Sequence, residues 1–424
     1  MPINPKSSGN AALTPASRPA TPGPARQRDV RLDFFRGIGM LIIFIAHVPY
    51  NAWTNYIPAR FGFSDATEIF VFCSGMASAI AFGRLFDERG FQVGATRIAY
   101  RCWQVYWAHI SIFMLVAASM VLADNWLGRD GGYQQGLNLV PFLSGDTGTN
   151  LVGLLTLTYV PNFFDILPMY LVILAMIPIV MALKKLGRAY VFAAIVATWL
   201  FATLGWINLP AEPWSDRVWF FNPFAWQLVF FTGFAFIGGW LPAPPINRPL
   251  MIAAAVFVLA VIPFHHAWFL TNFPFFSDAR NALGVLVDKT GFGLLRYVHF
   301  LALAYLAYAL AGPNGDNIRA IKGPFVATCC KVGQQALGVF LAGQLLSMLG
   351  GIYLNELGHT YFNTALVNFT GFALLIAVAY IAAYFKSSPW KTQKAAIALP
   401  AQSSPADGPR RTAAAPGGVS QPAE

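Results

Sequence analysis

The sequence predicts an all-α, polytopic membrane protein with about ten transmembrane helices and both termini in the cytoplasm. Of its 424 residues, 56% are hydrophobic and only 11% are charged, whereas soluble globular proteins carry about 25% charged residues. The mean hydropathy is +0.54. This composition excludes an ordinary cytosolic enzyme. The formal net charge of +10 does not indicate nucleic-acid binding, because the basic residues of membrane proteins collect in cytoplasmic loops.

Ten apolar segments are the candidate membrane spans. A helix needs about 20 predominantly apolar residues to cross a hydrocarbon core of about 30 Å. The segments cover residues 35–50, 68–86, 99–123, 166–183, 189–207, 224–241, 249–264, 292–311, 336–354 and 364–385. The further apolar stretch 151–160 is too short to span, so we expect it to be re-entrant or interfacial.

The predicted transmembrane domain, residues 28–385, lies between two ends of different composition. Residues 1–27 and 386–424 are rich in Pro, Ala and Ser, a composition that cannot bury a core. We therefore predict two disordered tails. With both tails in the cytoplasm and ten spans, most of the 28 Lys and Arg residues lie on the cytoplasmic side, as positive-inside sorting requires. The outer loops keep Arg60, Arg129, Arg217, Arg280 and Lys289.

The first predicted span carries His47, a functional candidate because ionisable groups are costly inside a membrane. His47 follows Arg36 by eleven residues, about 16 Å along a helix that begins at the cytoplasmic surface. A neutral imidazole near the bilayer centre can take a proton from a hydroxyl group. The alternative is a histidine that only packs between helices. Arg31, Asp33 and Arg36 are equally explained as orientation signals with a local ion pair.

Arg97 and Arg101 enter the third predicted span four residues apart, so their guanidinium groups share one helix face. Two such groups form a good clamp for phosphates. The alternative is that they only anchor the cytoplasmic end of the span. His109, further along the same segment, is rotated away from Arg101, and we interpret it as a packing residue.

Polar residues also mark the outer start of the fourth predicted span. Asp165 stands where its charge favours a helix N-terminus. Asn162, Asp165 and Tyr170 lie among aromatic residues, a combination suited to hydrogen bonding and stacking with a sugar. The alternative is that Asp165 is only a helix cap.

Arg296 and His299 lie three residues apart in the eighth predicted span and therefore share a face. An unpaired Arg in lipid is expensive, so Arg296 is expected to meet a partner or a cavity. One candidate partner is a carboxylate of a ligand, and the alternative is an outer-loop acid such as Asp165 or Asp288. No metal-ligand spacing, phosphate-binding loop, nucleophile elbow or dinucleotide fingerprint is present, so the sequence predicts no bound metal or cofactor.

The motif from Arg31 through Asp33, Arg36 and Gly37 to His47 resembles the first span of membrane acyltransferases of the acyltransferase-3 type. The Ser-Gly element in residues 70–76 and the basic entry at Arg97 and Arg101 resemble the same group. The sequence resembles the OpgC family more closely; these are membrane succinyltransferases that modify osmoregulated periplasmic glucans. The matching stretches are residues 165–170, 221–227 and 333–340, and the resemblance covers about residues 28–385.

The resemblance implies ten spans in a bacterial inner membrane, a cytoplasmic acyl donor and a periplasmic glucan acceptor, with lipid as the surroundings and no nucleic acid. The donor would be succinyl-CoA, held as a substrate rather than as a bound cofactor. The matching stretches add candidate substrate-binding residues to those above. The expected donor site comprises Arg31, Asp33, Arg36, Arg97 and Arg101. The expected catalytic residues are His47, Asp165, Arg296 and His299. The expected acceptor-binding residues are Asn162, Tyr170, Trp226 and Gln227.

In this mechanism His47 removes the proton of a glucan hydroxyl as its oxygen attacks the thioester carbonyl, and Arg296 receives the free carboxylate of the succinyl group. Direct transfer and a covalent acyl-histidine both remain open. Three other functions remain as alternatives: an O-acetyltransferase of surface polysaccharide or lipid-linked sugar, a transporter or flippase without chemistry, and a membrane scaffold. The sequence makes no prediction of the oligomeric state.

Overall fold

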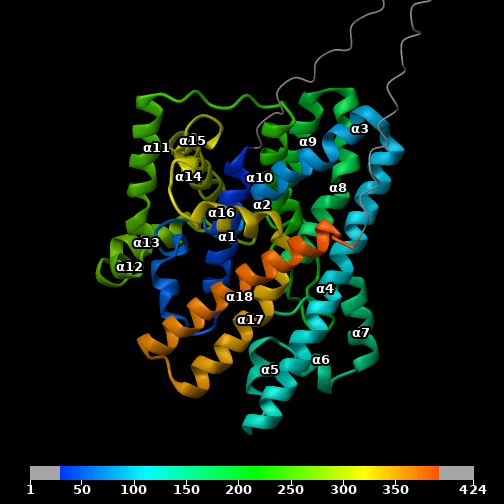
Figure 1. Cartoon of the computed structure of the whole chain (residues 1–424), viewed down its shortest axis with the longest axis vertical. Coiled ribbons are helices and arrows are strands. Elements are labelled where there is room, and N and C mark those ends of the chain that lie inside the picture. The colour runs from blue at the N-terminus through cyan, green and yellow to red at the C-terminus, as the bar shows by residue number, and fades with distance from the viewer. Residues whose placement is uncertain (1–28, 391–424) are drawn as a thin grey trace, which may run out of the picture. The chain divides into compact units, whose positions relative to one another are not determined.

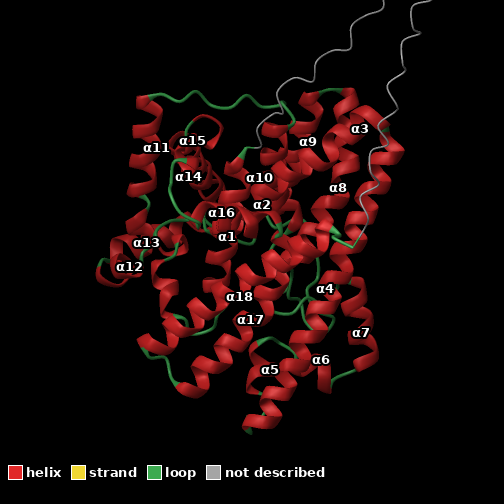
Figure 2. Cartoon of the chain, viewed as in Figure 1, coloured by secondary structure: helices red, strands yellow, loops and turns green. Residues whose placement is uncertain are grey.

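A computed structural model describes residues 29–390 of the chain. Helices are the only regular elements in this range (Figure 2), apart from one isolated antiparallel bridge between Pro210 and Val218. The chain divides into a large unit that ends at Ala383 and a short unit that begins at Tyr384. The predicted tail 1–27 and most of the predicted tail 386–424 lie outside the described residues.

The longer helices contain most of the ordered chain. They are α1 (Val30–His47), α2 (Ala66–Ser78), α4 (Phe91–Leu127), α7 (Thr147–Thr156), α8 (Ile166–Leu186), α9 (Arg188–Thr203), α10 (Pro223–Ile237), α11 (Arg248–Ala260), α13 (Pro274–Leu283), α14 (Leu294–Ala311), α16 (Phe325–Gln334), α17 (Ala336–Leu357) and α18 (Tyr361–Ser387). The short α helices are α3 (Arg84–Arg89), α5 (Gly132–Gly136), α6 (Val140–Ser144), α12 (Ala267–Asn272) and α15 (Asp316–Arg319). Six short 3-10 and π turns connect them.

Each of the ten predicted spans coincides with a helix. Six helical stretches are long and apolar enough to cross a membrane. Three more, which begin at Arg188, Pro223 and Arg248, are apolar but shorter. Helix α1 has 18 residues, and three of them are the charged residues of its first two turns. The protein is therefore a helical membrane protein, while the number of ten spans and the cytoplasmic location of the termini stay predictions.

Two segments outside the ten predicted spans are also helical, at least in part. The stretch 151–160 is helical only as far as Thr156, because Leu157 adopts the left-handed conformation that ends α7. The segment between the predicted spans 292–311 and 336–354 contains a helix, α16, in which the adjacent Cys329 and Cys330 lie. Their helix packs against α1, and Cys329 is buried in that contact.

Glycines allow the helices around α1 to approach closely (Figure 1). A Cβ on Gly37 of α1 would lie 1.9 Å from the carbonyl oxygen of Cys329 in α16. Helices α2 and α10 cross in the same way, because a Cβ on Gly75 would lie 1.9 Å from the carbonyl oxygen of Phe230, and one on Gly233 would lie 2.3 Å from that of Phe72. Small residues at such crossings let backbones pack without intervening side chains, as in membrane helix pairs generally.

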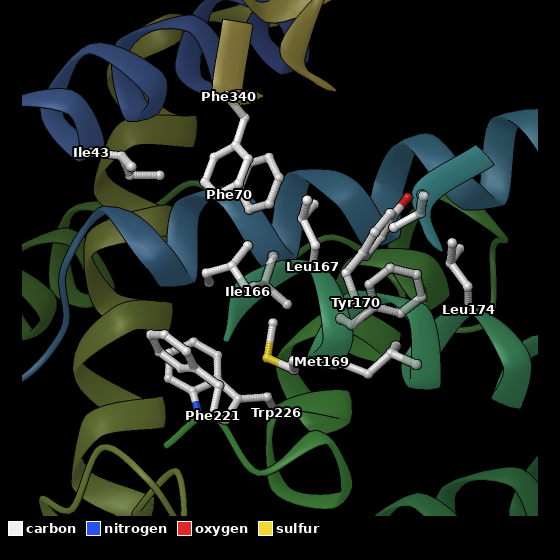
Figure 3. Packing of buried hydrophobic residues seen from close by; sticks show 14 of the residues in the cluster. Ile43, Phe70, Ile166, Leu167, Met169, Tyr170, Leu174, Phe221, Trp226 and Phe340 are labelled. Atoms are coloured by element: carbon white, nitrogen blue, oxygen red, sulfur yellow. The ribbon is translucent and has the colours of Figure 1, made fainter. Parts of the chain in front are cut away.

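An aromatic and aliphatic core fills the space between these helices (Figure 3). Phe70 of α2 stacks on Phe340 of α17, with ring centroids 6.0 Å apart and planes 15° from parallel. Phe221 meets Trp226 edge to face at 4.9 Å. These contacts fix the middle of α2 against α17, and the start of α10 against the loop before it.

Three helices begin at or next to residues that lie near the end of α1. Helix α2 begins at Asp65, whose carboxylate accepts from Thr67 N–H, while Glu68 accepts from the backbone of Asp65, which completes a capping box. Helix α8 begins after Asp165. Helix α10 begins after Asn222, which accepts from Phe224 N–H and is followed by a proline at the first helical position. These local signals position residues that line a cavity at the end of α1.

Candidate functional site

A cavity of about 580 Å³ lies at the C-terminal end of α1. Its walls come from α1, the N-termini of α2 and α8, the segment 217–221 before α10, and residues 289 and 290 before α14. Aromatic side chains of Phe163, Trp219, Phe220 and Phe221 form part of the wall. The polar and ionisable side chains in it are His47, Asp65, Thr67, Asn162, Asp165, Arg217, Lys289 and Thr290.

His47 is the last residue of α1, and its orientation is fixed by its own helix. Its Nδ1 lies 2.8 Å from the carbonyl oxygen of Ile43. A carbonyl only accepts, so Nδ1 carries the proton of the neutral ring and Nε2 keeps the lone pair. The ring also meets Phe163 edge to face at 5.7 Å. This arrangement leaves a basic nitrogen on a half-buried residue that lines the cavity.

A network of two acids and two bases extends from the cavity into the interior. Lys289 Nζ and Arg296 Nη2 lie 2.6 Å and 3.0 Å from the same carboxylate oxygen of Asp65. Arg296 Nε also pairs with Glu68, which is fully buried. Lys289 and Asp65 line the cavity, whereas Arg296 and Glu68 do not. The two acids balance the two bases, so each buried charge is paired, as burial requires.

The partners of Arg296 differ from the acids suggested by the sequence. Neither Asp165 nor Asp288 is among its partners, because the capping box of α2 presents Asp65 and Glu68 to it. The Asp-x-x-Glu pattern before an apolar run is a recognisable helix start, so the acids of α2 were detectable in the sequence. Their pairing with a residue more than 200 positions away was not.

A second charged pair, Arg217 and Glu212, supports the part of the cavity wall that residues 217–221 form. Arg217 Nε lies 2.9 Å from a Glu212 carboxylate oxygen, and its Nη2 donates to the carbonyl oxygen of Val160 at 2.7 Å. Asp165 is 5% exposed and accepts from Phe220 N–H at 3.4 Å. Burial raises the pKa of Asp165 to about 6, and the nearby Arg217 opposes that rise only in part. Asp165 is therefore both the cap position of α8 and a buried carboxyl group with a raised pKa.

His299 shares a helix with Arg296 but faces a different environment. The backbone N–H of Ser64 donates to its Nδ1 at 3.2 Å, and the Ser64 hydroxyl lies 2.7 Å from the same nitrogen. The ring packs edge to face against Phe63 at 6.1 Å, and a Cβ on Gly62 would collide with it. His299 is not among the residues that line the cavity. Its contacts hold the 62–64 segment that leads into α2.

The five predicted donor residues do not form one cluster in the structure. Arg31 pairs with Asp29 at 2.6 Å and lies over the ring of Tyr308 at 5.0 Å. Asp33 accepts from Gln334 Nε2 at 3.2 Å. Arg36 donates to the carbonyl oxygen of a cysteine of α2 at 2.6 Å. The structure thus ties these side chains to α14, α16 and α2.

Arg97 and Arg101 make their contacts within α4. Arg97 is exposed and lies over the ring of Tyr100 at 5.6 Å, and Arg101 donates to Gln104 at 3.2 Å. Helix α4 packs against α3, α5, α8 and α17. None of the five donor-site candidates lines the cavity at the end of α1.

The four acceptor-site candidates also separate. Asn162 lines the cavity and is exposed. Tyr170 packs in the core against Phe230, with ring centroids 6.2 Å apart. Trp226 donates to the carbonyl oxygen of Lys289 at 2.9 Å, and Gln227 donates to that of a residue in α9 at 2.8 Å. Trp226 therefore fixes the backbone next to the cavity cation, while Tyr170 and Gln227 are buried away from the cavity.

The structure adds Asp65, Arg217 and Lys289 to the site. The sequence had given the two bases only as outer-loop charges, because no local pattern indicates that their loops meet the end of α1. Between residues 29 and 390, no group of three His, Cys, Asp or Glu side chains is arranged as metal ligands.

Fold and site together define a class: a helical membrane protein whose first helix ends in a histidine at the wall of a polar, aromatic-lined cavity. The chain belongs to the OpgC protein family, whose model matches residues 28–387. This membership supports a glucan-modifying acyltransferase at the level of the family. Comparisons with curated proteins and with solved structures gave no match.

Proposed function

We propose that this protein is an O-acyltransferase of the bacterial inner membrane that moves a succinyl group from succinyl-CoA to hydroxyl groups of periplasmic glucans. The observation that carries this proposal is the arrangement of His47. Its Nδ1 is held by the Ile43 carbonyl oxygen, and the residue lines a cavity of about 580 Å³. A fixed neutral imidazole in a polar cavity is what a general base needs.

In the proposed reaction, Nε2 of His47 takes the proton of a glucan hydroxyl. The hydroxyl oxygen forms a bond to the thioester carbonyl carbon, and the carbon–sulfur bond then breaks. The thiolate of CoA leaves and takes the proton back from the imidazolium, so one ester and one thiol are formed. This direct transfer needs no residue other than His47 to change its protonation state.

Lys289 is the proposed partner of the free succinyl carboxylate. The sequence pointed to Arg296 for this role, but Arg296 does not line the cavity and is paired with the carboxylates of Asp65 and Glu68. Lys289 lines the cavity, and 30% of its side chain is exposed. In this proposal Arg296 acts as a positioning residue, because it holds the Asp65 carboxylate that Lys289 contacts.

The acceptor is proposed to enter between the aromatic wall of the cavity and the polar groups of Asn162 and Asp165. Aromatic faces and hydrogen-bonding groups together suit the apolar faces and hydroxyl edges of a sugar. The donor is proposed to approach from the N-terminal end of α1, where Arg31 and Arg36 lie, with Arg97 and Arg101 as further phosphate contacts. Because these four arginines lie on two different helices, α1 and α4, they suit an extended donor that contacts them at several points along its length.

The test is the charge and mass of periplasmic glucans from a strain that lacks its own enzyme and expresses this chain. Wild-type protein should add succinyl esters, each of which adds one negative charge. His47→Gln, expressed at the same level, should abolish the esters. His359→Ala is the matched control, because His359 is exposed and lies against Tyr50 rather than in the cavity. Wild-type ester content in His47→Gln would refute the role of His47.

An O-acetyltransferase is the second candidate, and one observation favours it. The charged side chains that line the cavity are two acids and two bases, Asp65, Asp165, Arg217 and Lys289, so the cavity has no formal excess of positive charge. The same mass measurement separates the two candidates, because an acetyl ester adds no charge. A transporter without chemistry predicts unmodified glucans and no consumption of acyl-CoA.

A further inference from the structure

A second, much smaller space lies on the other side of His47, between α1 and α17. Its volume of about 10 Å³ is close to what a single oxygen-sized group occupies. Phe340 and Gln344 of α17 form one wall, and α1 forms the other. His47 lines both this space and the 580 Å³ cavity.

The helical positions of α1 explain how one residue belongs to both spaces. Ile42 and Ala46, four residues apart, line only the large cavity, while Met40 and Phe44, also four apart, line only the small space. Residues four apart share a helix face. Ile43 and His47, also four residues apart, line both spaces. The imidazole therefore stands on the ridge between two faces of α1.

Gln344 is the unusual residue of the small space. It is 3% exposed, and neither its Nε2 nor its Oε1 has a hydrogen-bond partner among residues 29–390. A buried polar group without a partner is destabilising, so the amide at this position needs a hydrogen-bond partner that the neighbouring side chains do not supply. The neighbouring wall is otherwise apolar, with Phe340 held by its stack on Phe70.

We propose that the side-chain amide of Gln344 donates a hydrogen bond to the carbonyl oxygen of the acyl thioester and stabilises that oxygen as it becomes negatively charged. This inference rests on the proposed function. The carbonyl carbon lies beside His47 at the ridge, its oxygen occupies the small space, and the succinyl chain and the acceptor hydroxyl lie in the large cavity.

The step balances without a further reactant. His47 Nε2 accepts the hydroxyl proton, the hydroxyl oxygen bonds to the carbonyl carbon, and the carbonyl π electrons move to the oxygen that Gln344 contacts. When the carbon–sulfur bond breaks, the carbonyl re-forms and the departing thiolate takes the proton from His47. A hydrogen-bond donor is effective in such a step when it is aimed at the atom on which charge develops.

The experiment uses the detergent-solubilised full chain with succinyl-CoA and unsubstituted glucan, and compares Gln344→Leu and Gln344→Met with wild type. Both variants keep side-chain volume but remove the donor. We expect kcat to fall about 100-fold, the loss typical for one oxyanion-hole donor, while KM for succinyl-CoA stays within about threefold. The pKa values of the pH–rate profile should not move, because His47 is untouched. Thermal unfolding should be unchanged or shifted upward, since an unpaired amide has been removed.

Thr364→Val is the matched control. Thr364 is 1% exposed, its hydroxyl also lacks a partner among residues 29–390, and it lines neither space. Its kcat should equal that of wild type. A folded Gln344→Leu or Gln344→Met protein with kcat within about threefold of wild type would overturn the role of Gln344 and leave the proposed function intact. Wild-type protein that forms no ester would overturn both.

Discussion

The pairing of Arg296 with Glu68 and Asp65 makes a prediction that separates a structural role from ligand binding. Replacing Arg296 with Met keeps an apolar side chain of similar length but leaves Glu68, which is fully buried, without its base. Removing one partner of a buried pair costs about 3–5 kcal/mol. Asp65 keeps a base in the variant, because Lys289 lies 2.6 Å from it. The loss therefore arises mainly from Glu68.

The compensating variant is Glu68→Gln. Its amide oxygen can still accept from Asp65 N–H, as the Glu68 carboxylate does at 2.8 Å, so the cap of α2 is retained. Alone, Glu68→Gln should cost about 1–2 kcal/mol, because Arg296 keeps Asp65 as its partner. Combined with Arg296→Met, it should recover at least about 2 kcal/mol, because the uncompensated buried charge has been removed.

The assay is reversible unfolding in detergent of the wild type, the two single variants and the double variant, followed by acyl transfer with the folded double variant. If the losses in free energy of unfolding caused by the two single substitutions simply add in the double variant, Arg296 and Glu68 do not form the buried pair. The folded double variant should still prefer succinyl-CoA to acetyl-CoA. A loss of that preference would show that Lys289 does not select the succinyl carboxylate in the absence of Arg296.

Three further predictions follow from particular contacts. Gly233→Ala should destabilise the protein by about 1–3 kcal/mol in the same unfolding assay, because its Cβ would lie 2.3 Å from the Phe72 carbonyl oxygen; Gly338→Ala, whose Cβ has no atom nearer than 4.0 Å, should be neutral or stabilising. Asp165 has a pKa of about 6 in the folded protein, against about 3.9 in the unfolded chain, so the folded state binds the proton of this carboxyl group more tightly. The free energy of unfolding should therefore fall by up to about 3 kcal/mol as the pH rises from about 4 to above 6. Asp165→Asn should remove this pH dependence. Lys289→Met should lower kcat/KM for succinyl-CoA about 10- to 100-fold, the effect of losing a charged hydrogen bond, and should lower kcat/KM for acetyl-CoA less. A competition assay with both donors measures the two losses, and equal losses would exclude Lys289 as the carboxylate partner.

The sequence predicted the helical framework because hydropathy depends only on neighbouring residues. Each of the ten predicted segments is helical, and the boundaries differ mainly where helices extend beyond the apolar core, as α4 does to Phe91 and Leu127. The family resemblance, based on short motifs around His47 and in three later stretches, is confirmed by the match over residues 28–387. Helix α16 was missed because it has only ten residues, and Thr328, Lys331 and Gln334 interrupt its apolar character.

The composition of the cavity could not be predicted in the same way. Lys289, Asp65 and Arg217 come from three separate loops, and their meeting depends on how α1, α2, α8 and α10 pack. A lone outer-loop lysine gives no local signal that it will pair with a helix cap 224 positions earlier. The assignments of catalytic, donor-binding and acceptor-binding roles therefore stay predictions, although the structure brings only His47, Asp165 and Asn162 of those residues to the cavity.

The close crossing of α1 with α16 limits how a donor can reach His47. Gly37 and Gly333 bring these two backbones together, because a Cβ on either would lie 1.9 Å from a carbonyl oxygen of the other helix. The face of α1 that packs against α16 cannot separate from α16 without losing this backbone contact. The face of Met40 and Phe44, against α17, is instead the one that carries the small space beside Gln344. A donor that reaches the small space from Arg31 and Arg36 would pass along the seam between α1 and α17. A disulfide or bulky residue that closes this seam should block transfer without changing the cavity on the other side of His47.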